Sequence, residues 1–106
     1  MINLTTDEYV ETLDKLIGSV YQILPLFEEK NEHLADYIYS LVAVDLIGAH
    51  RMSKSTYDSE RWFNTASHVL LGLEYNLETI EHKQLRKQVF RVTNLLDSEK
   101  KRVESL

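Results

Sequence analysis

Apolar residues recur at three- and four-residue intervals along most of the chain, the spacing that places them on one side of an α-helix. No segment alternates apolar and polar residues as a half-buried strand does. The spacing predicts four helices: one that starts at Thr5 or Thr6, and three over about residues 32–52, 59–80 and 83–104. Because short connections favour antiparallel neighbours, we expect an all-α, single-domain protein over residues 1–106, an antiparallel up-down-up-down four-helix bundle.

The first predicted helix has a clear start and an ambiguous end. Thr5 and Glu8 have the spacing of a capping box, in which each side chain accepts a backbone N–H of the other residue. The apolar row then continues past Pro25, which removes a helical hydrogen bond and collides with the preceding turn. The helix therefore either kinks near Pro25 or ends at Leu24 and is followed by a short segment.

The helix predicted over 32–52, with Asn31 as its cap, is apolar around most of its circumference, which indicates a buried helix. Asp45 is the one charged residue between Tyr37 and Ala49, and in a regular α-helix it shares a face with Ile38. We therefore expect Asp45 to be a buried polar residue. A buried carboxylate needs partners or a proton, so it would either contact a ligand or be satisfied within the core, by a tyrosine hydroxyl, the Trp62 indole or an arginine.

The two later helices supply the rest of the predicted core. The six residues that we expect at its centre are Leu41, Val42, Val69, Leu73, Val92 and Leu96. Gly18, Gly48 and Gly72 all fall inside predicted helices, where each costs roughly 1 kcal/mol relative to alanine. A glycine tolerated in a helix often lets another backbone approach closely, so we expect tight packing there.

The amino-acid composition bears on the cellular compartment of the protein and on whether it has disulfides or a metal site. The chain has no cysteine, so it has neither disulfides nor a thiolate zinc site. We see no secretory signal and no membrane span, and we expect a cytoplasmic protein. The four histidines show no H-x-x-x-H or E-x-x-H spacing, so the sequence predicts no metal site and no cofactor.

Charge is distributed unevenly between the two halves of the chain. The net charge is −5 overall, but residues 1–50 carry nine acids and two bases, whereas residues 51–106 carry eight acids and ten bases. Such halves complement each other, within one subunit or between two copies. The acidic total argues against double-stranded nucleic acid as a partner, because binding to phosphates requires a basic surface.

Arg61 and His68 are seven residues apart, which is two helical turns, so their side chains point the same way. This pair resembles the Arg-x4–6-His signature of the HEPN-domain ribonucleases, which are small all-helical proteins. The resemblance covers two residues, and Trp62 stands where a polar residue commonly follows the arginine. It implies that Arg61 and His68 would cleave an RNA phosphodiester without a metal, across a dimer interface.

The same two residues also begin a longer row at seven-residue spacing, Arg61, His68, Tyr75 and His82. Tyrosine and arginine are enriched in protein interfaces. The row is therefore either a partner-binding seam or a solvated polar face.

The last predicted helix has a basic face that contains an aromatic residue. Phe90 lies almost opposite the apolar line of this helix, and five cations surround it: Lys83, Arg86, Lys87, Arg91 and Lys101. Such a face can bind an acidic protein, a second subunit or the bases of single-stranded nucleic acid. Alternatively, Phe90 folds over the edge of its own helix.

Together these patterns predict a small helical protein-interaction module, such as an adaptor, inhibitor or immunity-like binding protein, that self-associates. The partner-binding residues that we predict are Arg61, His68, Tyr75, His82, Arg86, Lys87, Phe90 and Arg91. The alternative is a HEPN-like ribonuclease that uses Arg61 and His68.

Overall fold

The computed structural model describes residues 5–51 and 58–105, and within these ranges it contains helices and no strands. The helices form an all-α bundle, as the sequence predicts. Its elements are α1 (Thr6–Tyr21), α2 (Ile23–Glu28), α3 (Leu34–Ser40), the π-helix η1 (Leu41–Leu46), α5 (Glu60–Tyr75) and α6 (His82–Glu104). The chain stays helical after η1 as far as Arg51.

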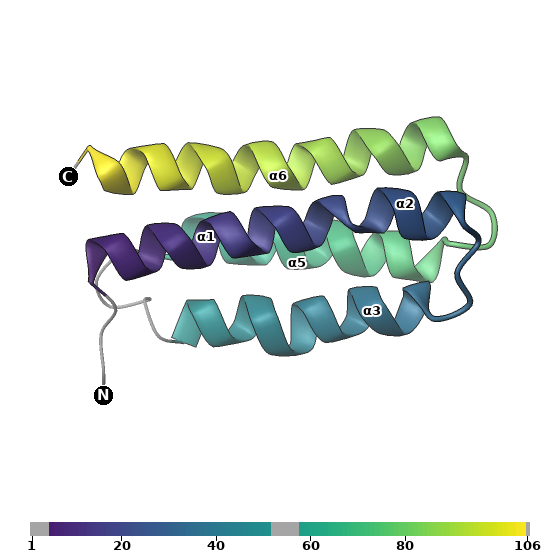
Figure 1. Cartoon of the computed structure of the whole chain (residues 1–106), viewed down its shortest axis with the longest axis horizontal. Coiled ribbons are helices and arrows are strands. Elements are labelled where there is room, and N and C mark those ends of the chain that lie inside the picture. Colours follow the sequence, from purple (N-terminus) through teal and green to yellow (C-terminus); the bar gives the residue numbers. More distant parts are fainter. Residues whose placement is uncertain (1–4, 52–57, 106) are drawn as a thin grey trace.

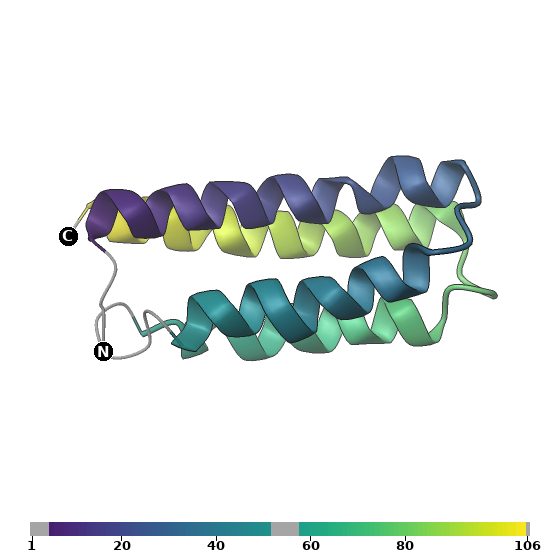
Figure 2. The ribbon, with the colours of Figure 1, turned by 60° about the horizontal axis from the view of Figure 1, so that its bottom comes forward.

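In the described chain these elements form four rods that lie alongside one another (Figure 1). The first rod is α1 with α2, the second is α3 with η1, and α5 and α6 are the third and fourth. Figures 1 and 2 show each rod running back along the one before it. The most extensive contact joins α1 to α6, and α5 packs against both α6 and α3. The first and last rods are therefore neighbours along their length.

Local signals set the ends of the first rod. The Thr5 hydroxyl oxygen accepts the Glu8 N–H at 3.2 Å, and the Glu8 carboxylate accepts the Thr5 N–H at 3.3 Å, which confirms the capping box. The helix breaks between Tyr21 and Ile23, before the proline. Pro25 has no N–H to donate to the carbonyl of Tyr21, and its ring crowds that carbonyl. The chain then resumes as α2 in nearly the same direction (Figure 1), so the break is a kink.

The second rod starts later than predicted. Lys30 has a φ of 54°, and the Asn31 side chain accepts the His33 N–H at 2.8 Å, an Asx-turn that delays the helix to Leu34. The polar segment that we predicted as a loop, Ser53 to Asp58, lies outside the described residues except for Asp58.

The third rod is shorter than predicted, because α5 ends at Tyr75 and not near residue 80. The Asn76 side chain donates to the carbonyl of Gly72 at 2.8 Å, and the Asn76 carbonyl accepts the Ile80 N–H at 2.9 Å. These bonds satisfy groups at the helix end and turn the chain toward α6. His82 is therefore the first residue of α6, and the predicted row Arg61–His68–Tyr75–His82 does not continue along one helix.

The core is the one that periodicity predicts. All six residues expected at its centre are buried, with exposed fractions of 8% or less. Tyr9 and Trp62 are the largest side chains with no exposed surface.

The prediction that Asp45 is buried is wrong. Asp45 is exposed, and Leu46 beside it is fully buried. The reason is η1: the hydrogen bonds of a π-helix span five residues, so this segment winds more loosely than an α-helix. The looser winding carries Leu46 into the core, five residues after Leu41, and turns Asp45 outward.

The prediction of close backbone packing at the helix glycines is also wrong for the described residues. A Cβ atom placed on Gly18, Gly48 or Gly72 would have no described neighbour within 4 Å, beyond the adjoining residues and the helix backbone. Gly18 and Gly72 lie on the surface.

Candidate interaction surface

The first half of α6 carries a basic surface that includes an aromatic ring. We define the α6 basic surface as Lys83, Arg86, Lys87, Phe90 and Arg91. Its four cations form no ion pair with any described residue. By contrast Lys101, the fifth cation of the predicted face, pairs with Asp97 at 3.0 Å. The positive charge of the α6 basic surface is thus left uncompensated within the described chain.

Phe90 lies at the centre of this surface and is half-buried. Its ring and the Tyr21 ring from α1 form a T-shaped pair, with centroids 5.9 Å apart and planes at 71°. The Arg86 guanidinium lies 5.4 Å from the centroid of the Phe90 ring, within the range of a cation–π contact. Phe90 therefore packs on the neighbouring helix while part of its ring stays accessible.

Arg91 belongs to the other edge of α6. It lines a depression between α5 and α6 together with His68, Gly72, Gln84 and Gln88. The structure therefore brings two of the predicted partner-binding residues, His68 and Arg91, to one place. Tyr75 lies near the end of α5 with 87% of its surface exposed.

His82 contacts α2. Its Nε2 lies 3.2 Å from a Glu28 carboxylate oxygen, and its ring stacks on Phe27 with centroids 5.9 Å apart. These contacts join the start of α6 to α2. His82 thus stabilises the junction of two rods.

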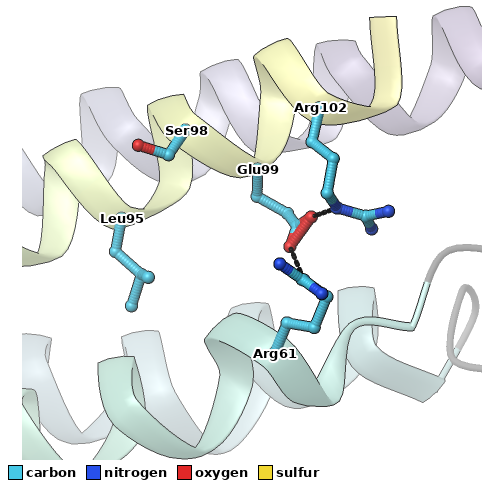
Figure 3. Close-up of a pocket in the computed structure, with 5 residues that line it drawn as sticks. All are labelled: Arg61, Leu95, Ser98, Glu99 and Arg102. Atoms are coloured by element: carbon cyan, nitrogen blue, oxygen red, sulfur yellow. Dashed lines mark hydrogen bonds and ion pairs between the residues drawn. The ribbon is translucent and has the colours of Figure 1, made fainter. Parts of the chain in front are cut away.

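Arg61 faces Glu99 across the groove between α5 and α6 (Figure 3). Its Nε atom lies 3.7 Å from one carboxylate oxygen of Glu99, and Arg102 forms a close ion pair with the other oxygen. The Glu99 side chain is 4% exposed and the Arg61 side chain 58%. Glu99 is therefore a buried carboxylate held by two more exposed arginines.

Sequence reasoning missed Glu99, although a signal existed. Glu99 lies seven residues after Val92 and four before Val103, so it occupies the apolar line of α6. A single acid on an otherwise apolar line marks a buried, partnered charge. The same pattern predicts a buried Asp45, but the π-helix changes the winding there. Because α6 is a regular helix, Glu99 stays on the buried line.

A second pair that the sequence did not reveal joins His50 and Ser59. The His50 Nδ1 and the Ser59 Oγ are 2.8 Å apart, and the His50 ring stacks on Phe63 with centroids 4.2 Å apart. Histidine and serine at this distance can form a nucleophilic dyad. Ser59, however, has no exposed surface, so a substrate has no access to its hydroxyl. The pair joins the end of the second rod to the start of α5.

The part of the chain that the structure covers can be compared with the requirements of a metal site and of a membrane-spanning helix. No three of its histidine, aspartate and glutamate residues lie close enough together to bind a metal ion. None of its helices combines the length and the apolar character that crossing a bilayer requires. No family model, curated protein or solved structure matches this chain.

Proposed function

We propose that this protein is a helical interaction module that binds an acidic protein surface through the α6 basic surface. The observation that carries the proposal is a set of four cations that form no ion pair with described residues. Lys83, Arg86 and Lys87 lie around the accessible part of Phe90, and Arg91 follows on the next edge of α6. Uncompensated charge of one sign steers a partner of the opposite sign, and an aromatic side chain beside it can become the apolar anchor of the contact.

A protein partner is favoured over nucleic acid by the charge of the whole chain. A net charge of −5 repels the phosphate backbone outside this one patch. An acidic protein surface need only match the patch itself. The same charge distribution favours partners that present carboxylates beside an apolar group.

The experiment is a titration of the full chain with fluorescently labelled poly-L-glutamate at about 0.05 and 0.2 M salt. We expect binding that weakens with salt, because surface charges are screened over about 10 Å at 0.1 M. Arg86→Glu should weaken the binding at least about tenfold by setting like charges together. Arg51→Glu makes the same charge change on the second rod, so it is the matched control and should leave binding nearly unchanged.

Two outcomes would overturn the proposal. One is equal binding by the wild type, Arg86→Glu and Arg51→Glu. The other is stronger, Arg86-dependent binding to a labelled oligothymidine than to poly-L-glutamate, which would assign the surface to single-stranded nucleic acid.

A second proposal, a HEPN-like ribonuclease, is supported by the exposure of both Arg61 and His68 on α5, about 10 Å apart along the helix axis. The two residues line separate depressions, and Arg61 contacts Glu99. The proposal predicts RNA cleavage in the presence of EDTA that Arg61→Ala and His68→Ala both abolish. Cleavage that survives both substitutions would come from another source.

A further inference from the structure

The face that α1 and α6 share has an acidic end and a basic end. Asp7, Glu11, Asp14 and Glu104 line a depression at the end where α1 begins and α6 finishes. At the other end the same two helices bring Tyr21 against Phe90, beside Arg86 and Lys83. Figure 1 shows the purple start of α1 beside the yellow end of α6.

Helical spacing places both ends on one side of the molecule. Asp7, Asp14 and Tyr21 are seven residues apart on α1, as are Lys83, Phe90, Asp97 and Glu104 on α6. Two contacts join α1 to α6 along these rows: Asp14 pairs with Lys100, which lies between Asp97 and Glu104, at 2.9 Å, and Tyr21 contacts Phe90. Asp7 and Tyr21 are fourteen residues apart, so the two ends are separated by about 20 Å.

Much of the negative charge at the acidic end of this face is available to bind a cation from another molecule. Asp7 and Glu104 form no ion pair with any residue that the structure describes. Glu11 pairs with Lys15 at 3.4 Å, but both side chains are more than two-thirds exposed, and such a pair contributes little. The acidic end can therefore accept a second cationic partner.

Between its acidic and basic ends, this face of α1 has uncharged residues with small protruding side-chain surface. Ile17 is half-buried. Gly18 is exposed, and a Cβ atom placed on it would have no described neighbour within 4 Å, beyond the adjoining residues and the helix backbone. Another helix can approach the backbone closely at Gly18. Val10, Ile17, Tyr21 and Phe90 supply apolar surface along the same face.

We infer that the α1–α6 face binds the same face of a second copy about a two-fold axis. This inference rests on the proposed function. It assigns the acidic end of the second copy's α1–α6 face as the surface that the α6 basic surface binds. A two-fold axis through the centre of the face places the acidic end of one copy against the basic end of the other. A face with opposite charges at its two ends is therefore self-complementary. Each Arg86 then lies over the acidic end of the other copy, and the two Gly18 residues lie near the axis.

The test is a charge exchange measured by light scattering and sedimentation across a range of protein concentrations. We expect the wild type to form dimers. Glu11→Lys with Glu104→Lys cancels the net negative charge of the acidic end, and Lys83→Glu with Arg86→Glu cancels the net positive charge of the basic end. Each double variant alone should dimerise at least about tenfold more weakly. An equimolar mixture should recover dimers, because in the mixed pair the unaltered acidic end of one variant meets the unaltered basic end of the other.

Circular dichroism checks that each variant is folded, and Arg51→Glu is the control for charge change away from the face. Gly18→Gln is an independent variant. Its side chain has room within its own chain, so the bundle should fold, but it fills the centre of the contact and should weaken dimerisation.

The inference is wrong if the wild type is monomeric throughout, if the mixture of double variants does not associate, or if assemblies grow beyond dimers with concentration. These failures are distinct from failure of the proposed function. A monomer that still binds poly-L-glutamate through Arg86 would keep the proposed function and exclude the second copy as partner.

Discussion

The indole N–H of Trp62 donates a hydrogen bond of 2.9 Å to the hydroxyl oxygen of Tyr9, and neither residue has any exposed surface. The two residues are 53 positions apart and belong to the first turns of α1 and α5. Two large aromatic side chains with polar groups can share a core only if those groups pair. This bond therefore fixes how the starts of the two helices lie relative to each other.

Tyr9→Phe should lower the free energy of unfolding by about 1–3 kcal/mol, because it leaves the buried indole N–H without this acceptor. A double-mutant cycle with Trp62→Phe isolates the coupling between the two residues. Denaturant unfolding provides the measurement. Tyr39→Phe is the control, since Tyr39 is 60% exposed and should change stability little. No coupling in the cycle would show that the bond adds nothing to stability.

Leu41→Ala and Leu73→Ala should each cost about 2–5 kcal/mol, the usual range for a buried leucine. Leu71→Ala is a matched control on the same helix as Leu73, because Leu71 is 40% exposed. We expect it to cost much less. Thermal melts of the three variants test the core assignment, and a Leu73→Ala melting temperature within a degree or two of the wild type would contradict it.

Asp45→Asn and Asp45→Ala should have equally small effects on stability. The structure places Asp45 on the surface, so removing its carboxylate leaves no buried partner unsatisfied. Side-by-side urea unfolding of the two variants is sufficient. A clear loss for alanine that asparagine avoids would mean that Asp45 is buried after all, and that η1 winds as a regular α-helix.

Glu99→Leu should be nearly neutral or stabilising, because leucine suits the apolar site and the two arginines left behind, with side chains 58% and 31% exposed, can be solvated. Arg102→Ala should be destabilising by about 1–3 kcal/mol, since it removes the close partner of a carboxylate that stays buried. The double variant, Glu99→Leu with Arg102→Ala, should be more stable than Arg102→Ala alone. If the double variant is the least stable of the three, Glu99 has a role beyond this pair.

Stability should fall at high pH through Tyr37. Burial raises the pKa of the Tyr37 hydroxyl above its ordinary value of 10.0, and the negative charge of Asp45 raises it further. The hydroxyl also donates to the Ser19 carbonyl at 2.6 Å. Below pH 10 both the folded and the unfolded chain hold this proton. Above pH 10 the unfolded chain loses the Tyr37 proton first. The stability that the protonated Tyr37 hydroxyl contributes is therefore lost as the pH rises through the pKa of the folded protein.

Tyr37→Phe should therefore lose less stability than the wild type between pH 9 and pH 11. Urea unfolding at stepped pH values provides the measurement, and Tyr39→Phe is the exposed control. Identical slopes for the wild type and Tyr37→Phe would show that another group controls the alkaline transition.

Periodicity alone was sufficient to predict the helices and most of the core. The line Leu85, Val89, Val92, Leu96 is buried along a regular α-helix, and the Thr5–Glu8 cap lies where its spacing predicts. These features depend on neighbours within one turn, and local geometry is the same in any helix. The sequence therefore determined that this chain is an all-α bundle and which side of most helices faces its centre.

The tertiary structure decided what local spacing does not encode. The π-helix turns Asp45 outward to bury Leu46, because packing across the bundle outweighs regular winding. The turn after Tyr75 moves His82 onto α6 and against Glu28. Glu99 gains its second arginine because Arg61 approaches from α5, and Phe90 packs on the neighbouring helix because Tyr21 lies opposite on α1. Each of these outcomes depends on residues distant in the sequence, so it is fixed by how the helices meet.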